Sequence, residues 1–184
     1  MIKNLFTFLL VFASLISQGQ SNLDSLYRIW QDETQTDSLR LQAYKTYIWD
    51  GFLYSQPDSA YLLSKAMIHF GEKNKYPKAV NQAYTLQSIA YDLQGNFEKA
   101  MELAEKSIQA NKAIGNKAGV SEAEIVMGVT LEEQGIYPAA LEHYNKALAI
   151  DEEINNREGM AMSLNNIGNI FNNQGDNTRA LESY

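Results

Sequence analysis

The chain has 184 residues, of which 45% are hydrophobic and 20% charged, a composition that is typical of an ordinary globular protein and argues against disorder. Its formal net charge is -7 and its lysines and arginines are scattered, so we expect no binding to nucleic acid or to an anionic membrane surface. It has no cysteine, which excludes disulfides, thiolate metal sites, a cysteine nucleophile and lipid attachment at a processed N-terminal cysteine.

The first residues predict an export signal. Lys3 precedes an apolar run over residues 5–16, and small residues around Gly19 provide a cleavage site. A membrane anchor is the alternative, but the run is well short of the roughly 20 apolar residues that span a bilayer. We therefore expect a cleaved signal peptide over residues 1–19, a periplasmic or extracytoplasmic mature chain, and no membrane span within that mature chain.

A divergent segment follows over residues 20–36. Asn22 can cap a short helix over residues 23–31, and the polar residues 31–36 end it. The expected apolar face of this helix is formed by Leu23, Leu26, Tyr27 and Trp30.

The sequence then repeats with a period of 40 residues. Residues 91–100, 131–140 and 171–180 superpose without a gap, a spacing that indicates stacked helical hairpins. We predict an array over residues 37–184, with repeats over 37–76, 77–116, 117–156 and an incomplete one over 157–184. The expected helices cover residues 37–54, 57–70, 77–94, 97–114, 117–134, 137–154, 157–174 and 177 onward. In the first of these helices, which Thr36 and Asp37 can cap, the candidate core positions are Leu39, Ala43, Tyr47 and Phe52.

Each repeat carries the same small residues at the same spacing. A small residue on the first helix and an alanine on the second let the two helices pack closely, since the distance between helices depends on the side chains at their crossing. A glycine in the turn can take the left-handed conformation that ends the first helix. These positions are Ser88, Gly95, Phe97 and Ala100, then Gly128, Gly135, Tyr137, Ala140 and Ala147, then Gly168, Gly175 and Ala180.

This pattern resembles the tetratricopeptide repeat family. The 40-residue period is longer than the usual 34 and resembles a subclass with longer helices, while Asn177 stands where an aromatic residue is usual. Helical repeats of the HEAT and armadillo kind have a similar period and are the competing fold. The resemblance implies an all-α, right-handed superhelical solenoid of antiparallel hairpins that binds proteins or peptides without catalysis.

No arrangement of residues in the sequence indicates a catalytic or metal-binding site. His69 and His143 lack a ligand cluster and are expected to be ordinary surface or boundary histidines. The acidic residues 132–133 and 151–153 are consecutive on predicted helices, so their side chains diverge and are expected to be solvated. We therefore expect no catalytic residue, cofactor or metal within these residues.

The resemblance places the first helix of each repeat on a concave face, where partners bind. An asparagine amide offers both donors and an acceptor, so the asparagines of the last repeat can hold the backbone of a peptide. The cations that grip a C-terminal carboxylate in some family members are absent. The candidate partner-binding residues are Asn165, Asn169 and Asn172, with an apolar floor formed by Thr85, Ile89, Ile125 and Val129.

Two functions are compatible with these features. The first is an interaction module of the bacterial envelope that binds a protein or peptide segment. The alternative is the extracytoplasmic sensory region of a larger signalling protein, because the chain resembles the N-terminal halves of Bacteroidetes-like sensor histidine kinases, nucleotide cyclases and helix-turn-helix regulators. The register stops inside a repeat, with Tyr184 matching Tyr144, so we expect a truncated reading frame or a fragment. The uncapped last repeat is also a candidate surface for self-association.

Overall fold

The computed structural model describes residues 22–184, and this part of the chain is built from helices and turns without a strand. The predicted signal peptide over residues 1–19 lies outside the described residues. Residue contacts divide the chain into two compact units, one reaching to Gln56 and the other running from Pro57 to Tyr184. The boundary between these units lies inside the predicted repeat 37–76.

The first unit holds a helix over residues 22–31, helix α2 (Asp37–Ile48) and a π-helix, η1 (Trp49–Leu53). The predicted cap of α2 is confirmed, because the Thr36 hydroxyl oxygen accepts a hydrogen bond from the Leu39 amide at 3.3 Å. An aromatic stack joins the two α-helices, with the rings of Trp30 and Tyr44 only 4.2 Å apart. Burial raises the pKa of Tyr44 to about 12, so its hydroxyl stays protonated at any physiological pH.

The buried face of α2 differs from the predicted face. Leu39 was expected inside, but it is 42% exposed, because the buried face of α2 instead follows Leu41, Tyr44 and Ile48. Ala43 is buried as expected, whereas Tyr47 and Phe52 are only half-buried. The sequence did not predict the π-helix.

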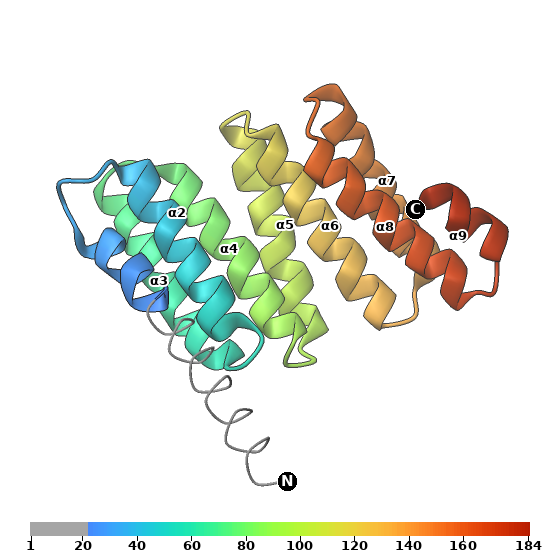
Figure 1. Ribbon diagram of the computed structural model, residues 1–184, viewed down its shortest axis with the longest axis horizontal. Helices are drawn as coiled ribbons and strands as arrows, with labels where there is room; N and C mark the ends of the chain where they lie inside the picture. The colour runs from blue at the N-terminus through green and yellow to red at the C-terminus, as the bar shows by residue number, and fades with distance from the viewer. Residues whose placement is uncertain (1–21) are drawn as a thin grey trace, which may run out of the picture. The chain divides into compact units, whose positions relative to one another are not determined.

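The second unit is a series of antiparallel helices in which each helix packs against the next along the chain (Figure 1). Its helices begin where the sequence predicts and end one to three residues away from the predicted ends. They are α3 (Pro57–Lys73), α4 (Pro77–Asp92), α5 (Phe97–Ala113), α6 (Lys117–Glu133), α7 (Tyr137–Glu153), α8 (Arg157–Asn173) and the short α9 (Asn177–Ser183). The all-α solenoid of antiparallel hairpins is thus confirmed.

The turns follow the 40-residue period. Gly95, Gly135 and Gly175 end the first helices with φ of 73°, 74° and 78°, the left-handed conformation that the sequence predicts. The turns that lead from one hairpin to the next use the same region at Lys75 and Asn155, where φ is 53° and 55°. The chain therefore reverses by the same backbone conformation within and between hairpins.

The predicted small residues of the helix crossings lie in the core, and the contact of Gly128 differs from the one expected. Ala140 is buried against Tyr144 and Ala147 in a core cluster that also includes residues of α6 and α8. Gly128, expected to face Ala140, lies directly under the ring of Tyr144, one turn further along α7. Ser88 takes the corresponding place in α4, and its hydroxyl donates to the Ala100 carbonyl at 2.7 Å.

Candidate interaction surface

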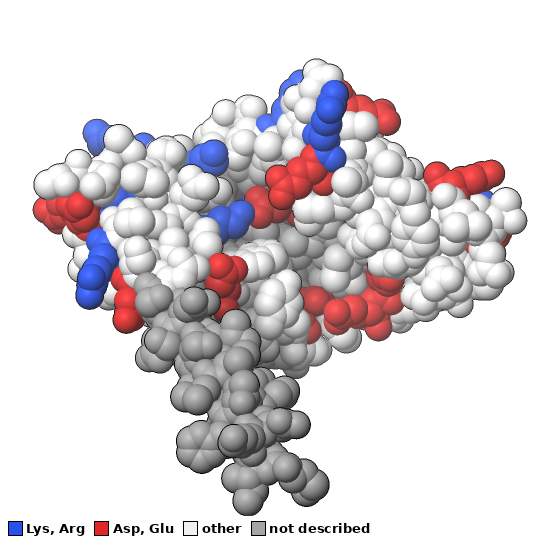
Figure 2. Space-filling model, in the orientation of Figure 1, with Lys and Arg blue, Asp and Glu red and all other residues white. Residues whose placement is uncertain are grey.

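The first helices of the last three predicted hairpins form one continuous surface of the second unit. Helix α4 contacts α6, and α6 contacts α8, while α5, α7 and α9 pack as their hairpin partners. We call the outward surface of α4, α6 and α8 the first-helix face. Figure 2 shows acidic side chains gathered over the part of the molecule where α6 lies in Figure 1.

Two residues of the predicted apolar floor do not reach this face. Thr85 is buried, and its hydroxyl shares a hydrogen bond of 2.9 Å with the hydroxyl of Ser107 on α5. Ile125 is also buried, and it packs in the same core cluster as Tyr144 and Ile167. Both side chains point between the helices, where a partner cannot contact them.

The next positions along the same helices do reach the face. Ile89, Val129 and Asn169 stand at equivalent places in α4, α6 and α8, and all three are half-buried. The amide oxygen of Asn169 accepts a hydrogen bond of 2.8 Å from the Tyr184 hydroxyl. Part of the hydrogen-bonding capacity of the Asn169 side chain is therefore already used. Asn172 is exposed.

Asn165 lies in a pocket of about 620 Å³ between α8 and α9. The pocket is lined by polar and apolar side chains together, including Met162, Ser183 and Tyr184. The structure thus brings Asn165 together with the end of the chain, a neighbour that the sequence did not predict.

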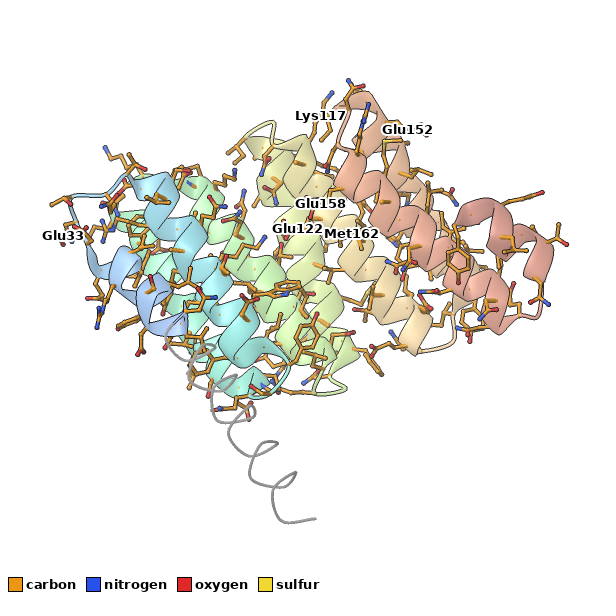
Figure 3. The ribbon with its side chains drawn as sticks, viewed as in Figure 1. Glu33, Lys117, Glu122, Glu152, Glu158 and Met162 are labelled. Atoms are coloured by element: carbon orange, nitrogen blue, oxygen red, sulfur yellow. The ribbon has the colours of Figure 1, made fainter. Side chains whose placement is uncertain are left out.

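Glutamates border the first-helix face near this pocket. Glu158, at the start of α8, lines the pocket together with Met162, one turn later. Figure 3 shows these two side chains and Glu122 of α6 on the part of the face where α6 and α8 lie side by side. The surface therefore combines carboxylates, amides and exposed apolar groups.

His143 has a carboxylate partner that the sequence did not reveal. It is half-buried, and its Nδ1 lies 2.7 Å from Glu124 Oε2 across the α6–α7 pair. Glu124 precedes His143 by 19 residues, so helical spacing within one helix could not reveal this carboxylate. Within residues 22–184 no group of three histidine, aspartate or glutamate side chains is arranged to hold a metal ion.

The acidic residues are not all solvated. Asp151 is 0% exposed, and its carboxylate accepts hydrogen bonds from the Ser121 hydroxyl and, at 2.8 Å, from the Asn156 amide. Glu132 is half-buried and accepts a hydrogen bond of 2.7 Å from the Tyr144 hydroxyl. The prediction of solvated charge is wrong for Asp151, because Ser121 of α6 and Asn156 of the turn after α7 place polar groups around its carboxylate.

The geometry defines a repetitive helical scaffold with a long surface of mixed chemistry. Such a surface can contact an extended segment at several points in succession. Among the helices of residues 22–184, none has both the length and the apolar character needed to cross a membrane.

Comparison with protein families identifies the repeat. Residues 82–114 and 119–184 match two models of the tetratricopeptide repeat, and together these matches cover more than half of the chain. The chain is a tetratricopeptide repeat protein. Arrays of this family generally bind proteins or peptides and are generally non-catalytic, so the chain is a protein-interaction scaffold.

One solved structure supports the fold. The crystal structure of BtubC (BKLC) from P. vanneervenii is similar with a TM-score of 0.61 at 15% sequence identity, covering 88% of this chain and 67% of that chain. The crystal structure of MamA has a TM-score of 0.46 at 17% identity, covering 79% of this chain and 83% of that chain. None of the curated proteins matches the sequence.

Proposed function

We propose that the first-helix face binds an extended segment of a partner protein. The observation that carries this proposal is the row formed by Ile89, Val129 and Asn169, one side chain from each of three adjacent helices. Two apolar side chains provide contact area at one end of the row. At the other end Asn165 and Asn172 are exposed, and their amides can donate to and accept from a peptide backbone.

Site-specific photo-crosslinking tests this proposal. The full chain carries p-benzoylphenylalanine in place of Asn165 or Asn172, both exposed on α8, and is irradiated in an envelope extract. The matched control carries the same group in place of Gln109, which is exposed on α5, a second helix. We expect a partner adduct from the α8 positions and none from the control. Equal adduct formation from Gln109 contradicts binding on the first-helix face.

We further propose that the protein works in the bacterial envelope. The support is the apolar run over residues 5–16 behind Lys3, with the small residues that follow it. We expect the chain recovered from a periplasmic fraction to begin at Gln20, as measured by intact mass. The variant Leu9→Arg interrupts the apolar run, and we expect it to stay unprocessed in the cytoplasm. A chain that keeps residues 1–19 in the periplasm contradicts cleavage.

The alternative, a sensory region of a larger signalling protein, stays a prediction and is compatible with the same binding surface. Self-association is a further proposal, supported by the large exposed side chains of Leu181 and Tyr184 on the last hairpin.

A further inference from the structure

We infer that a pocket between α3, α4 and α5 binds a primary amide, the side chain of an asparagine or glutamine of a partner protein. This site goes beyond the proposed function, because it lies on a different side of α4 from the first-helix face. Gln87, which lines the pocket, is two residues from Ile89, and two residues turn a helix by about 200°. The two side chains therefore point to opposite sides of α4.

The pocket has a volume of about 210 Å³ and is formed by three consecutive helices. This volume is below the roughly 300–1,000 Å³ of pockets that hold drug-sized ligands, so the pocket suits a single side chain. Helix α4 packs against both α3 and α5. The lining residues are Tyr61 of α3, Gln87 and Tyr91 of α4, and Lys99, Glu102 and Leu103 of α5.

Gln87 is the most deeply buried residue of this pocket, and its amide lacks a partner. The residue is 5% exposed, whereas the other lining residues are half-buried or exposed. Among residues 22–184 none forms a hydrogen bond with the Gln87 side chain. An amide that is withdrawn from water without hydrogen bonds is unfavourable. Its carbonyl oxygen and two N–H groups can be satisfied by a ligand in the pocket.

The later repeats fill the equivalent place with apolar side chains. Forty residues after Gln87 stands Met127, and forty residues later stands Ile167, each of which belongs to an apolar core cluster. At the place of Tyr61, Met101 packs against the first of these clusters. Packing of the repeat therefore does not require a glutamine at position 87, and the polar pocket is a departure from the repeat.

Two aromatic rings stand beside the amide. The ring centres of Tyr61 and Tyr91 are 5.2 Å apart, and the ring planes are inclined by 58°. Lys99 Nζ lies 5.1 Å from the centre of the Tyr91 ring, so this ring already stabilises the lysine charge. A planar, uncharged group can pack against such walls while it reaches Gln87.

The charges at the rim do not favour an acidic ligand. Lys99 and Glu102 both line the pocket and have opposite charges. A hydrogen bond from Lys106 and, to a smaller extent, the charge of Lys99 lower the pKa of Glu102, so this carboxylate is ionised at neutral pH. A carboxylate in the pocket would be repelled by Glu102 and would leave the Gln87 carbonyl oxygen without a donor.

A primary amide matches both ends of the Gln87 side chain. Its carbonyl oxygen and one of its N–H groups lie on the same edge, so it can accept from and donate to Gln87 in two parallel hydrogen bonds. The N–H and C=O of a trans peptide group point in opposite directions and cannot form this pair. Because the chain is a protein-interaction scaffold, an asparagine or glutamine side chain of a partner is the source of the amide.

NMR titration with a model of the glutamine side chain tests the pocket. The probe is N-acetyl-glutamine methylamide, added to the full chain while the side-chain amide signals of Gln87 are followed. The controls are the glutamate analogue, which has the same shape and a carboxylate, and the methionine analogue, which is apolar. Both controls keep the peptide groups of the probe. We expect only the glutamine probe to shift the Gln87 signals. Equal shifts from either control, or none from the glutamine probe, overturn the inference.

A substitution taken from the next repeat localises the effect. Gln87→Met introduces the residue found at position 127 and is therefore expected to fold. We expect it to weaken binding of the glutamine probe at least about tenfold, measured at the backbone amides of Tyr91 and Leu103, because two buried hydrogen bonds are lost. The matched control, Gln109→Met, removes an exposed amide from α5 and is expected to leave binding within about twofold. Unchanged binding by a folded Gln87→Met variant overturns the inference.

A second variant removes one wall of the pocket and keeps the amide. Tyr61→Met introduces the residue found at position 101, and we expect it to weaken binding at least about threefold through lost ring contacts. If Gln87→Met loses the native circular dichroism spectrum, Tyr61→Met decides, and unchanged binding then overturns the inference. Gln109 stands six residues, about 9 Å, beyond Leu103 and does not line the pocket, so the crosslinking test of the first-helix face is independent of this titration.

Discussion

Replacing Gly128 with alanine is expected to lower the free energy of unfolding by about 1–3 kcal/mol, whereas the same change at Gly168 is expected to alter it by less than about 1 kcal/mol. The two glycines occupy equivalent places in α6 and α8. An added Cβ would lie 2.4 Å from Cε1 of Tyr144 in the first case and 2.7 Å from Cε1 of Tyr184 in the second. Both separations are too short, so in each case the ring must move.

The two rings differ in their freedom to move. Tyr144 is 0% exposed, and its hydroxyl donates to Glu132, so displacing its ring disturbs the core and breaks this hydrogen bond. Tyr184 is 62% exposed and can move into solvent. Alanine also favours helix over glycine by about 1 kcal/mol at both positions, which reduces the loss at Gly128 and offsets the smaller cost at Gly168.

Urea denaturation followed by circular dichroism measures both variants. The preceding repeat suggests a rescue, because there Ser88 stands at the place of the glycine and the smaller Ala104 at the place of the tyrosine. We expect Gly128→Ser combined with Tyr144→Ala to lose at least about 1 kcal/mol less than the sum of the single changes. Equal losses at Gly128 and Gly168, or an additive double variant, would show that the tyrosine ring does not determine the cost.

The helices of the second unit could be predicted from the sequence because every boundary is repeated. Gly95, Gly135 and Gly175 mark the turn at the same phase of three repeats, so each of these signals is checked by its equivalents. The prolines add support at single helix starts, as Pro77 does at the start of α4. The first unit has no such internal check. There the exposed Leu39 was predicted in the core, because a periodic face alone does not fix how a short helix is rotated.

The candidate surface could be predicted only in part. Spacing within a helix selected Ile89 and Asn169, which are half-buried, but it could not show that Thr85 turns toward Ser107 on the next helix. Contacts between helices also hid the partner of His143.

Buried polar groups between successive hairpins were the largest omission, although the sequence carries a sign of them. Eight residues after the polar Asn111 stands Gly119, and eight residues after Asp151 stands Gly159. In the first repeat the glycine is at the first of the two positions, because Gly71 is followed eight residues later by the larger Ala79. Each pair therefore holds one glycine, as expected if the two positions share one space.

Replacing Gly159 with alanine is accordingly expected to lower the free energy of unfolding by about 2–4 kcal/mol, the sum of overpacking and lost buried hydrogen bonds. The added Cβ would lie 2.2 Å from Oδ2 of Asp151 and 2.6 Å from Nδ2 of Asn156. The carboxylate cannot move away without losing its bonds to Ser121 and Asn156, and it is fully buried. A displaced carboxylate would remain in the core as a charge with fewer donors.

The exchange seen in the first repeat provides the decisive control. Asp151→Gly combined with Gly159→Ala recreates the pair formed by Gly71 and Ala79, removing the buried charge together with the clash. Although glycine near the end of α7 costs about 1 kcal/mol of helix propensity, we expect the double variant to be at least about 1 kcal/mol more stable than the sum of the two single losses predicts. Urea denaturation of the four proteins measures this coupling. Strict additivity would mean that the side chains at the two positions do not compete for one space. The glycine of each pair would then matter for its backbone and not for the polar side chain that it accommodates.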